Sequence, residues 1–358
     1  MPYYAQWNAG VERELGDRLL LRAQYVGTHG YDLTYQMHVN GYQTVCEGCF
    51  APYPYGQPVD PRFGDVIQFM SNASSRYNGL QLTLERRPNA GLSWIVNYTL
   101  SHAQDEVSNG GFLPFSAGGL LSPLPGELAR NWGDADYDVR HNLTATYSYE
   151  LPVHASRPWV AALANGWHLS QTFFWRSGLP FTVQSAPYTA NGNGIINGGG
   201  PQFASLVPGV PLYTTTPIPG VTPAGALQWL NPNAFISSVD PTTGACVAGD
   251  SPATCQFGTL GRNTVRGPQF FWSDLYVTKR LAASRGITWR AELQMFNPFN
   301  RANFALPASI AGIPGQPITQ TGFSALTSTT SPPTGLLGVG LGGDNSPRMI
   351  AIQLKAEF

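Results

Sequence analysis

The chain has 358 residues, and only 11% of them are charged, less than half of the roughly 25% that is usual for a soluble domain. Its 40 glycines and 30 prolines exclude a long helical bundle or coiled coil. A net charge of −1 offers no attraction to phosphates, so no nucleic-acid partner is expected, and no apolar run reaches the about 18 residues of a transmembrane helix.

Apolar residues instead alternate with polar residues along nine segments, which is the period of a β-strand. We expect each segment to form a strand of about the 9 to 11 residues that a tilted strand needs to cross a bilayer. In chain order the alternation covers residues 6–12, 19–25, 80–86, 92–100, 142–151, 167–175, 271–277, 287–295 and 350–358.

The connections between these segments alternate in length without exception. Short turns are expected near residues 15–17, 88–91, 152–166 and 281–286, and long loops over about 29–75, 104–137, 178–266 and 297–347. Outer-membrane barrels combine short periplasmic turns with long extracellular loops. The sequence therefore predicts an all-β fold, an antiparallel transmembrane β-barrel wall, whose first strand begins at the outer face and whose C-terminus lies in the periplasm.

The placement of charges indicates which face of the sheet meets lipid. Arginine or lysine facing lipid costs about 2 to 4 kcal/mol at the bilayer midplane and about 0 to 1 kcal/mol near the interfaces. Arg22, Glu292 and Lys355 lie in mid-strand on the polar face, whereas Arg86 and Lys279 share the apolar face only at strand ends. We expect outer-membrane lipid against the apolar face. A soluble two-sheet sandwich with aromatic core faces is the alternative.

Seven stretches of the sequence form an ordered series, among them LNPNAFI at 230–236, FGTLGRNTVRGPQFFWSDLYVTKRL at 257–281 and WRAELQMFNPFNRANFALP at 289–307. The remaining four are residues 6–33, 74–105, 134–152 and 166–183. Through this series the chain resembles a known family, the Oar-like TonB-dependent outer-membrane transporters, over the C-terminal part of their barrel.

The last nine residues, IAIQLKAEF, resemble the outer-membrane assembly signal. A terminal aromatic residue follows apolar residues at alternate positions, here Phe358 after Ile350, Ile352, Leu354 and Ala356. The resemblance implies that the barrel-assembly machinery binds this segment.

For the whole protein the resemblance implies a barrel of about 22 strands, of which these would be the C-terminal nine or so. Family members begin with a signal peptide, an N-terminal module, a TonB box and a plug, which we do not find in residues 1–358. We therefore expect residues 1–358 to be a partial outer-membrane β-barrel domain, a fragment of the family's transporter.

The function that the resemblance implies is energised, non-enzymatic uptake of a large or scarce solute, such as a glycan, a peptide or a metal chelate. The protein would lie in the outer membrane of a Gram-negative cell, the TonB system would act through the missing plug, and no cofactor is expected. A soluble secreted carbohydrate-binding β-sandwich is the alternative. An outer-membrane hydrolase is a weaker one, because the sequence has no Gly-x-Ser-x-Gly or HExxH motif.

Two features of the expected loops suggest chemistry. Cysteines form two local pairs, Cys46 with Cys49 and Cys246 with Cys255, for which we expect loop disulfides rather than a redox or zinc site, since no second CxxC follows. Asp134, Asp136 and Asp138 place three carboxylates on one expected strand face with Arg140. They are weak candidates for a calcium site, and a lumen-side ion-pair network is the preferred interpretation.

Overall fold

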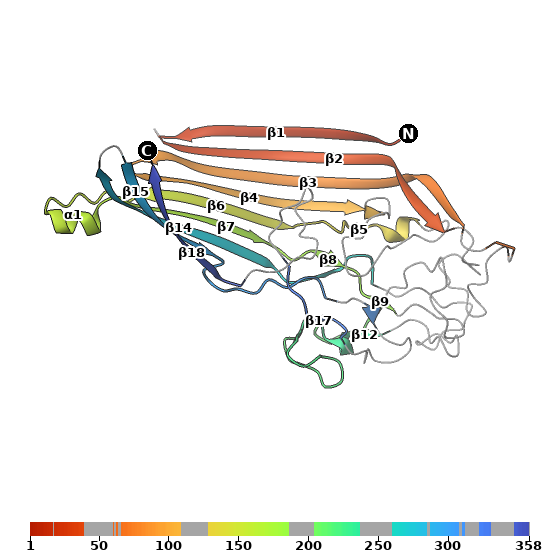
Figure 1. The fold of residues 1–358 in the computed structure, drawn as a ribbon. Coiled ribbons are helices and arrows are strands. Elements are labelled where there is room, and N and C mark those ends of the chain that lie inside the picture. Colours follow the sequence, from red (N-terminus) through yellow and green to blue (C-terminus); the bar gives the residue numbers. More distant parts are fainter. Residues whose placement is uncertain are drawn as a thin grey trace.

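The computed structural model describes residues 1–16, 18–38, 60, 62–63, 66–108, 128–185, 204–236, 260–284, 287–307, 310–311, 322–330 and 347–357. Nine long strands form one antiparallel sheet in chain order, as the alternation predicts (Figure 1). The two outermost strands, β1 and β18, each pair on one side only, so the sheet is open. The nine strands are β1 (Tyr3–Leu15), β2 (Leu19–His38), β3 (Ile67–Asn89), β4 (Leu92–Asp105), β6 (His141–Glu150), β7 (Trp167–Arg176), β14 (Phe270–Ser284), β15 (Ile287–Phe296) and β18 (Met349–Glu357).

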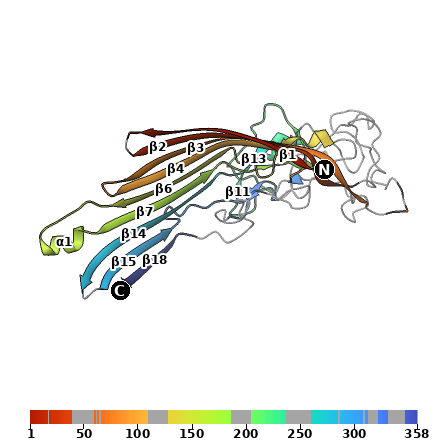
Figure 2. The same cartoon turned by 90° about the horizontal axis from the view of Figure 1, so that it is seen from above.

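The two ends of the sheet differ in the length of their connections (Figures 1 and 2). We call the end with the short connections the turn end, where β1 joins β2, β3 joins β4, β6 joins β7 and β14 joins β15. The opposite end, where the long connections lie, is the loop end. The connection between β6 and β7 was expected to be a plain turn, but it contains a helix, α1 (Pro158–Ala164). No helix among the described residues is long and apolar enough to cross a membrane.

The first strands extend further towards the loop end than the sequence suggests. Residues 29–38 and 67–75, expected within a loop, prolong β2 and β3, and a bulge between Gly30 and Leu33 interrupts their register. Tyr35 and Ala73, both 2% exposed, pack there against Val107. Leu33, Tyr35 and Met37 alternate with polar residues in this extension, so the strand pattern continues into a stretch that was expected to be a loop.

The long connections after β7 and β15 fold together at the loop end into a small unit, which we call the loop head. Four two-residue strand pairs build it, and two of them join the two connections directly: β11 (Leu227–Gln228) pairs with β17 (Ala325–Leu326), and β9 (Gln184–Ser185) pairs with β16 (Ile310–Ala311). The other pairs are β10 (Ser205–Leu206) with β12 (Phe235–Ile236) and β13 (Val265–Arg266) with β8 (Pro180–Phe181). Its apolar core contains Phe181, Val183, Ala204, Val221, Leu230, Ala234, Phe235, Leu260, Val265 and Phe323.

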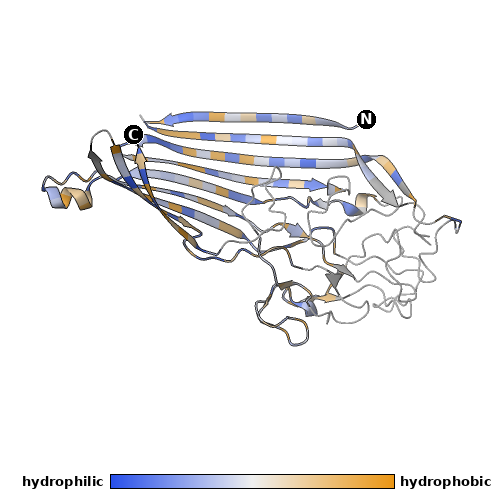
Figure 3. Cartoon of the chain, viewed as in Figure 1, coloured by the Kyte–Doolittle hydropathy of each residue, from blue (hydrophilic) through white to orange (hydrophobic). Residues whose placement is uncertain are grey.

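The register of the long strands keeps the two faces of the sheet chemically distinct. Directly opposed residues form an apolar row that runs through Leu21, Leu84, Val96, Ala145 and Phe173. The neighbouring row on the other face runs through Arg22, Thr83, Asn97 and Thr144. Figure 3 shows the resulting alternation of hydrophilic and hydrophobic residues along the strands. We call these two surfaces the apolar face and the polar face.

Candidate functional site

Aromatic side chains with polar tips mark the loop end of the apolar face. The Tyr98 and His141 rings lie 6.2 Å apart, and the hydroxyl of Tyr98 lies 2.8 Å from Nδ1 of His141. Trp175 follows at 6.3 Å from His141 and donates from Nε1 to Oε1 of Gln269 at 3.0 Å. Rings that are apolar at one end and hydrogen-bonded at the other suit the boundary between lipid and water.

A second aromatic group marks the turn end of the same face. Trp167 donates from Nε1 to the Leu163 carbonyl at 2.7 Å, and Nζ of Lys279 lies 5.3 Å from the Trp167 ring centre. On α1, Trp159 and Leu163 are 68% and 69% exposed and lie four residues apart, hence on one helix face. The helix lies beside Trp167 through the Leu163 carbonyl, and its exposed apolar pair suits the membrane interface.

One polar group interrupts the apolar face, and sequence analysis missed it. Gln171 of β7 shares the parity of Phe173, where alternation predicts an apolar side chain. The hydroxyl of Tyr147 donates to its Oε1 at 3.1 Å, and its Nε2 donates to Oγ of Ser273 at 2.9 Å. Gln171 and Ser273 are 8% and 1% exposed, so both side chains are hydrogen-bonded away from the surrounding apolar medium.

The polar face carries hydrogen bonds that link side chains across neighbouring strands. Oγ1 of Thr83 donates to Oδ1 of Asn97 at 2.9 Å, and Nδ2 of Asn97 donates to Oγ1 of Thr144 at 3.4 Å. Arg22 of β2 donates from Nε to Oε2 of Glu12 on β1 at 2.6 Å. The mid-strand charge of Arg22 therefore lies on the face that the sequence predicts, with a carboxylate beside it.

At the loop end, a buried guanidinium joins the loop head to the sheet. Arg262, whose side chain is 2% exposed, contacts the Asp105 carboxylate at the end of β4 and lies 3.2 Å from Oδ1 of Asp136. Its Nε donates to the Asn131 carbonyl at 2.8 Å, and its Nη1 donates to Oγ of Ser108 at 3.3 Å. The Arg262 side chain thus binds three segments, at residues 105–108, at Asn131 and at Asp136, each more than a hundred residues from it in sequence.

A second arginine from the loop head binds the other two aspartates. Arg266 contacts the carboxylates of Asp134 and Asp138, and the Asp138 side chain is fully buried. His102 Nε2 lies 2.7 Å from Oδ1 of Asp134. Arg140, the partner suggested by the sequence, is more distant, at 3.5 Å from Asp134 and 3.8 Å from Asp138. We call the four aspartates and three arginines of these two groups the loop-end ion cluster: Asp105, Asp134, Asp136, Asp138, Arg140, Arg262 and Arg266.

The structure corrects the expected backbone around these aspartates. Only Gly133–Asp134 form a strand, β5, and the next residues turn, with the Asp138 amide donating to the Ala135 carbonyl at 2.8 Å. The three carboxylates consequently do not share one strand face. Among the described residues, no three histidine, cysteine, aspartate or glutamate side chains are grouped to hold a metal ion. Beside the cluster, burial and the Asp105 carboxylate raise the pKa of the Tyr137 hydroxyl.

The sequence could not have named the arginine partners. Arg262 and Arg266 lie in a Gly-rich connection, and nothing in their spacing relates them to an aspartate run more than 120 residues earlier. The four cysteines and Phe358 lie outside the described residues. The apolar residues of the expected assembly signal lie on β18, where Ile350, Ile352 and Leu354 are exposed and oppose Met295, Leu293 and Ala291 of β15.

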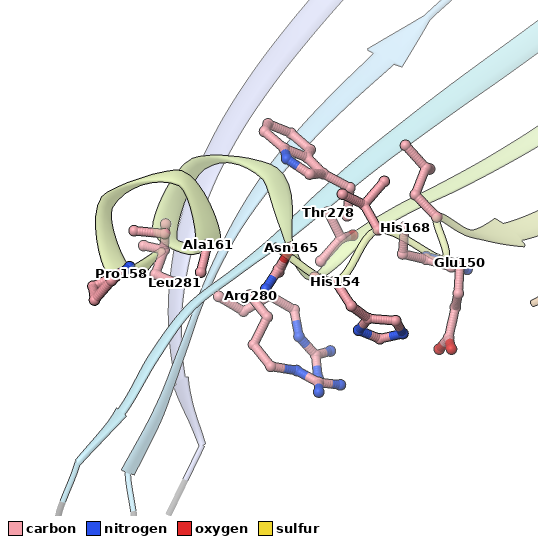
Figure 4. Close-up of a pocket in the computed structure, with 15 residues that line it drawn as sticks. Glu150, His154, Pro158, Ala161, Asn165, His168, Thr278, Arg280 and Leu281 are labelled. Atoms are coloured by element: carbon pink, nitrogen blue, oxygen red, sulfur yellow. The ribbon is translucent and has the colours of Figure 1, made fainter. Parts of the chain in front are cut away.

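At the turn end, a pocket of about 720 Å³ lies between α1 and the ends of the strands (Figure 4). Ala161 and Ala162 of α1 line one side. His168, Thr278 and Arg280 line the other, and all three have the parity of the polar face. Alternation alone does not predict this pocket, because the helix that covers it comes from a segment expected to be a plain turn.

Comparison with known proteins identifies one matching family. A family model described as an outer membrane beta barrel domain matches residues 1–337. Among solved structures, the outer membrane transporter YddB from Escherichia coli is 8% identical with a TM-score of 0.42, and the match covers 84% of this chain and 29% of that one. A Pseudomonas aeruginosa FadL homologue is 10% identical with a TM-score of 0.22, and the match covers 99% and 66%. No curated protein sequence matches.

Proposed function

Because the chain belongs to the outer-membrane β-barrel domain family and lies in the outer membrane, we propose that it forms part of the wall of a larger TonB-dependent transporter barrel. The observation that carries this proposal is the nine-stranded antiparallel sheet with one apolar and one polar face. Such a sheet suits lipid on one side and an aqueous lumen on the other. We include TonB dependence in this proposal because the sequence resembles the Oar-like TonB-dependent transporters.

The direction of the edge strands supports a larger barrel. Nine successive antiparallel strands leave β1 and β18 running the same way, from the loop end to the turn end (Figure 1). Pairing β18 with β1, within one copy or between copies, would therefore be parallel. Unpaired edges are not tolerated in lipid. An antiparallel closed barrel needs an odd number of further strands between these edges, and 13 would complete a barrel of about 22.

In this arrangement the turn end is periplasmic and the loop head is extracellular. The loop head and its ion cluster stand over the outer opening, where a solute arrives, and the polar face lines the path inward. A large or scarce solute such as a glycan, a peptide or a metal chelate would pass a plug that the TonB system pulls. The barrel-assembly machinery would bind β18 through Phe358.

The two alternatives are less well supported in the part of the chain that the structure describes. A sandwich needs a second large sheet against the apolar face, and the described residues form one large sheet and four two-stranded pairs. A serine hydrolase needs a base oriented by an acid. Ser148 Oγ lies 2.7 Å from Nε2 of His168, but within the described ranges no carboxylate bonds to His168.

Solute uptake by intact cells tests the proposal. Three strains are compared: wild type, a deletion of the gene, and wild type in which TonB is depleted. Loss of candidate glycans, peptides and metal chelates from the medium is followed by mass spectrometry. We expect at least one solute to be consumed by wild type alone. Equal uptake in the deletion strain, or uptake that persists after TonB depletion, would contradict the proposal.

The orientation is tested separately by protease treatment of whole cells. Residues 204–236 of the loop head should be cleaved from outside, whereas the connection that contains α1 should be cleaved only after the outer membrane is permeabilised. Cleavage of α1 in intact cells would invert the assignment of the two ends.

A further inference from the structure

Three cationic side chains lie directly opposite one another at the turn end of the polar face. Arg280 of β14 opposes Arg290 of β15, which opposes Lys355 of β18. Like charges in this arrangement repel. Arg290 donates to Oε2 of Glu357 at 3.0 Å, and Lys355 Nζ lies 2.7 Å from Oε2 of Glu292. Arg280 is exposed and makes no ion pair within the described residues, so the row retains an uncompensated positive charge.

Two members of this row, Arg280 and Arg290, line the turn-end pocket (Figure 4). His154 lines the same pocket. Glu150 lines another part of the pocket and forms no ion pair with either arginine in the described structure. The pocket walls also include the apolar side chains of Ala162 and Leu281. The pocket therefore combines a cationic region with an apolar wall.

We propose that the turn-end pocket binds an amphiphilic anion, with its oxyanion between Arg280 and Arg290 and its apolar part against Ala162 and Leu281. Guanidinium groups bind phosphate and carboxylate through paired hydrogen bonds. A volume of about 720 Å³ lies within the range of small-molecule sites. The anion balances the charge that the row of arginines leaves uncompensated. This site is separate from the loop head and does not depend on the transport proposal.

Calorimetric titration of the full-length protein in an uncharged detergent tests the site. Hexyl phosphate carries both the oxyanion and the apolar part, inorganic phosphate carries only the first, and hexanol only the second. We expect hexyl phosphate to bind tightest. Arg280→Gln and Arg290→Gln should each weaken it about tenfold or more. Arg157 lies in the connection that contains α1 but outside the pocket lining, so Arg157→Gln should leave the binding of hexyl phosphate unchanged.

A variant that keeps both arginines separates the pocket from simple charge. Ala162→Trp fills the apolar side, so it should remove the preference for hexyl phosphate over inorganic phosphate. Heat-modifiable migration on gels confirms that each variant is folded. The proposal is wrong if hexyl phosphate binds wild type no more tightly than the two glutamine variants, or if Ala162→Trp keeps the full preference.

Competition identifies the source of the natural anion once hexyl phosphate binding is established. In nanodiscs that contain an anionic phospholipid, weaker binding of hexyl phosphate than in zwitterionic nanodiscs supports a lipid head group as the ligand. Equal binding in both supports a soluble amphiphilic anion instead.

Discussion

Replacing Arg262 by methionine tests whether the loop-end ion cluster attaches the loop head to the sheet. The Arg262 side chain is 2% exposed, and its partner Asp105 is 5% exposed. Methionine keeps much of the length and apolar volume of the arginine but leaves the carboxylates of Asp105 and Asp136 without their cation. The hydrogen bonds to the Asn131 carbonyl and to Ser108 are lost as well.

The burial of Arg262 and Asp105 determines how much stability the loop head should lose in Arg262→Met. Breaking a buried ion pair by removing one partner costs about 3 to 5 kcal/mol, because the remaining charge stays desolvated. Since about 1.4 kcal/mol is a factor of ten, the open form of the loop head should become at least roughly a hundred times more populated. Within the described residues, the hydrogen bonds and ion pairs of the Arg262 side chain reach the long strands only at Asp105, the last residue of β4, so the sheet itself should remain folded.

Hydrogen exchange read by mass spectrometry measures this change directly. Amide exchange in residues 128–138 and 260–266 should accelerate by roughly a hundredfold or more, while β6, β7 and β15 exchange as in wild type. Arg140→Met is the matched control, because Arg140 belongs to the same cluster but lies 3.5 and 3.8 Å from its carboxylates and is 32% exposed. Arg140→Met should lower the stability of the loop head by no more than about 1 kcal/mol.

A compensating change distinguishes lost charge balance from lost packing. Adding Asp105→Asn to Arg262→Met removes the uncompensated buried carboxylate and should recover part of the protection. Unchanged exchange in Arg262→Met would refute the role of the cluster. Equal effects of Arg262→Met and Arg140→Met would refute the part assigned to burial.

Three further predictions concern the sheet. Leu293→Arg, on the apolar face of β15, should lower the free energy of unfolding by about 2 to 4 kcal/mol and reduce the fraction of assembled barrel on heat-modifiable gels. The adjacent Gln294→Arg, on the polar face, should have little effect. An equal loss in both variants would contradict the assignment of the two faces. Phe358→Ala should reduce assembled protein in outer-membrane fractions without changing synthesis, and wild-type assembly would exclude the C-terminal signal. Gly27→Ala should speed hydrogen exchange in β1, because a β-carbon at Gly27 would clash with the Trp7 indole. Adding Trp7→Ala to the same chain should restore part of the protection of the β1 amides. If Gly27→Ala alone has no effect, the Trp7 ring can move freely and the prediction is wrong.

The strands, their order and their two faces could be predicted because each is encoded locally. A residue in a strand faces one side or the other according to its position, so Leu80, Leu82 and Leu84 reveal their common face from the sequence alone. The extension of β2 beyond residue 29 was missed although Leu33, Tyr35 and Met37 alternate there with polar residues, because its pairing with residues 67–73 of β3 closes a long connection that the local pattern does not record. Gln171 was missed for a related reason, because its hydrogen-bond partners belong to other strands.

The sites depended on contacts between distant parts of the chain. The aspartate run was visible in the sequence, but its main partners, Arg262 and Arg266, reach it only because the loop head folds back onto the end of β4. Arg280 and Arg290 become opposed only through the register of β14 and β15, and the pocket they line exists only because α1 covers it. The sequence by itself determined a membrane-facing antiparallel sheet, since periodicity is a property of neighbouring residues. The tertiary structure decided which charges meet, because that depends on how long connections close and no local pattern records it.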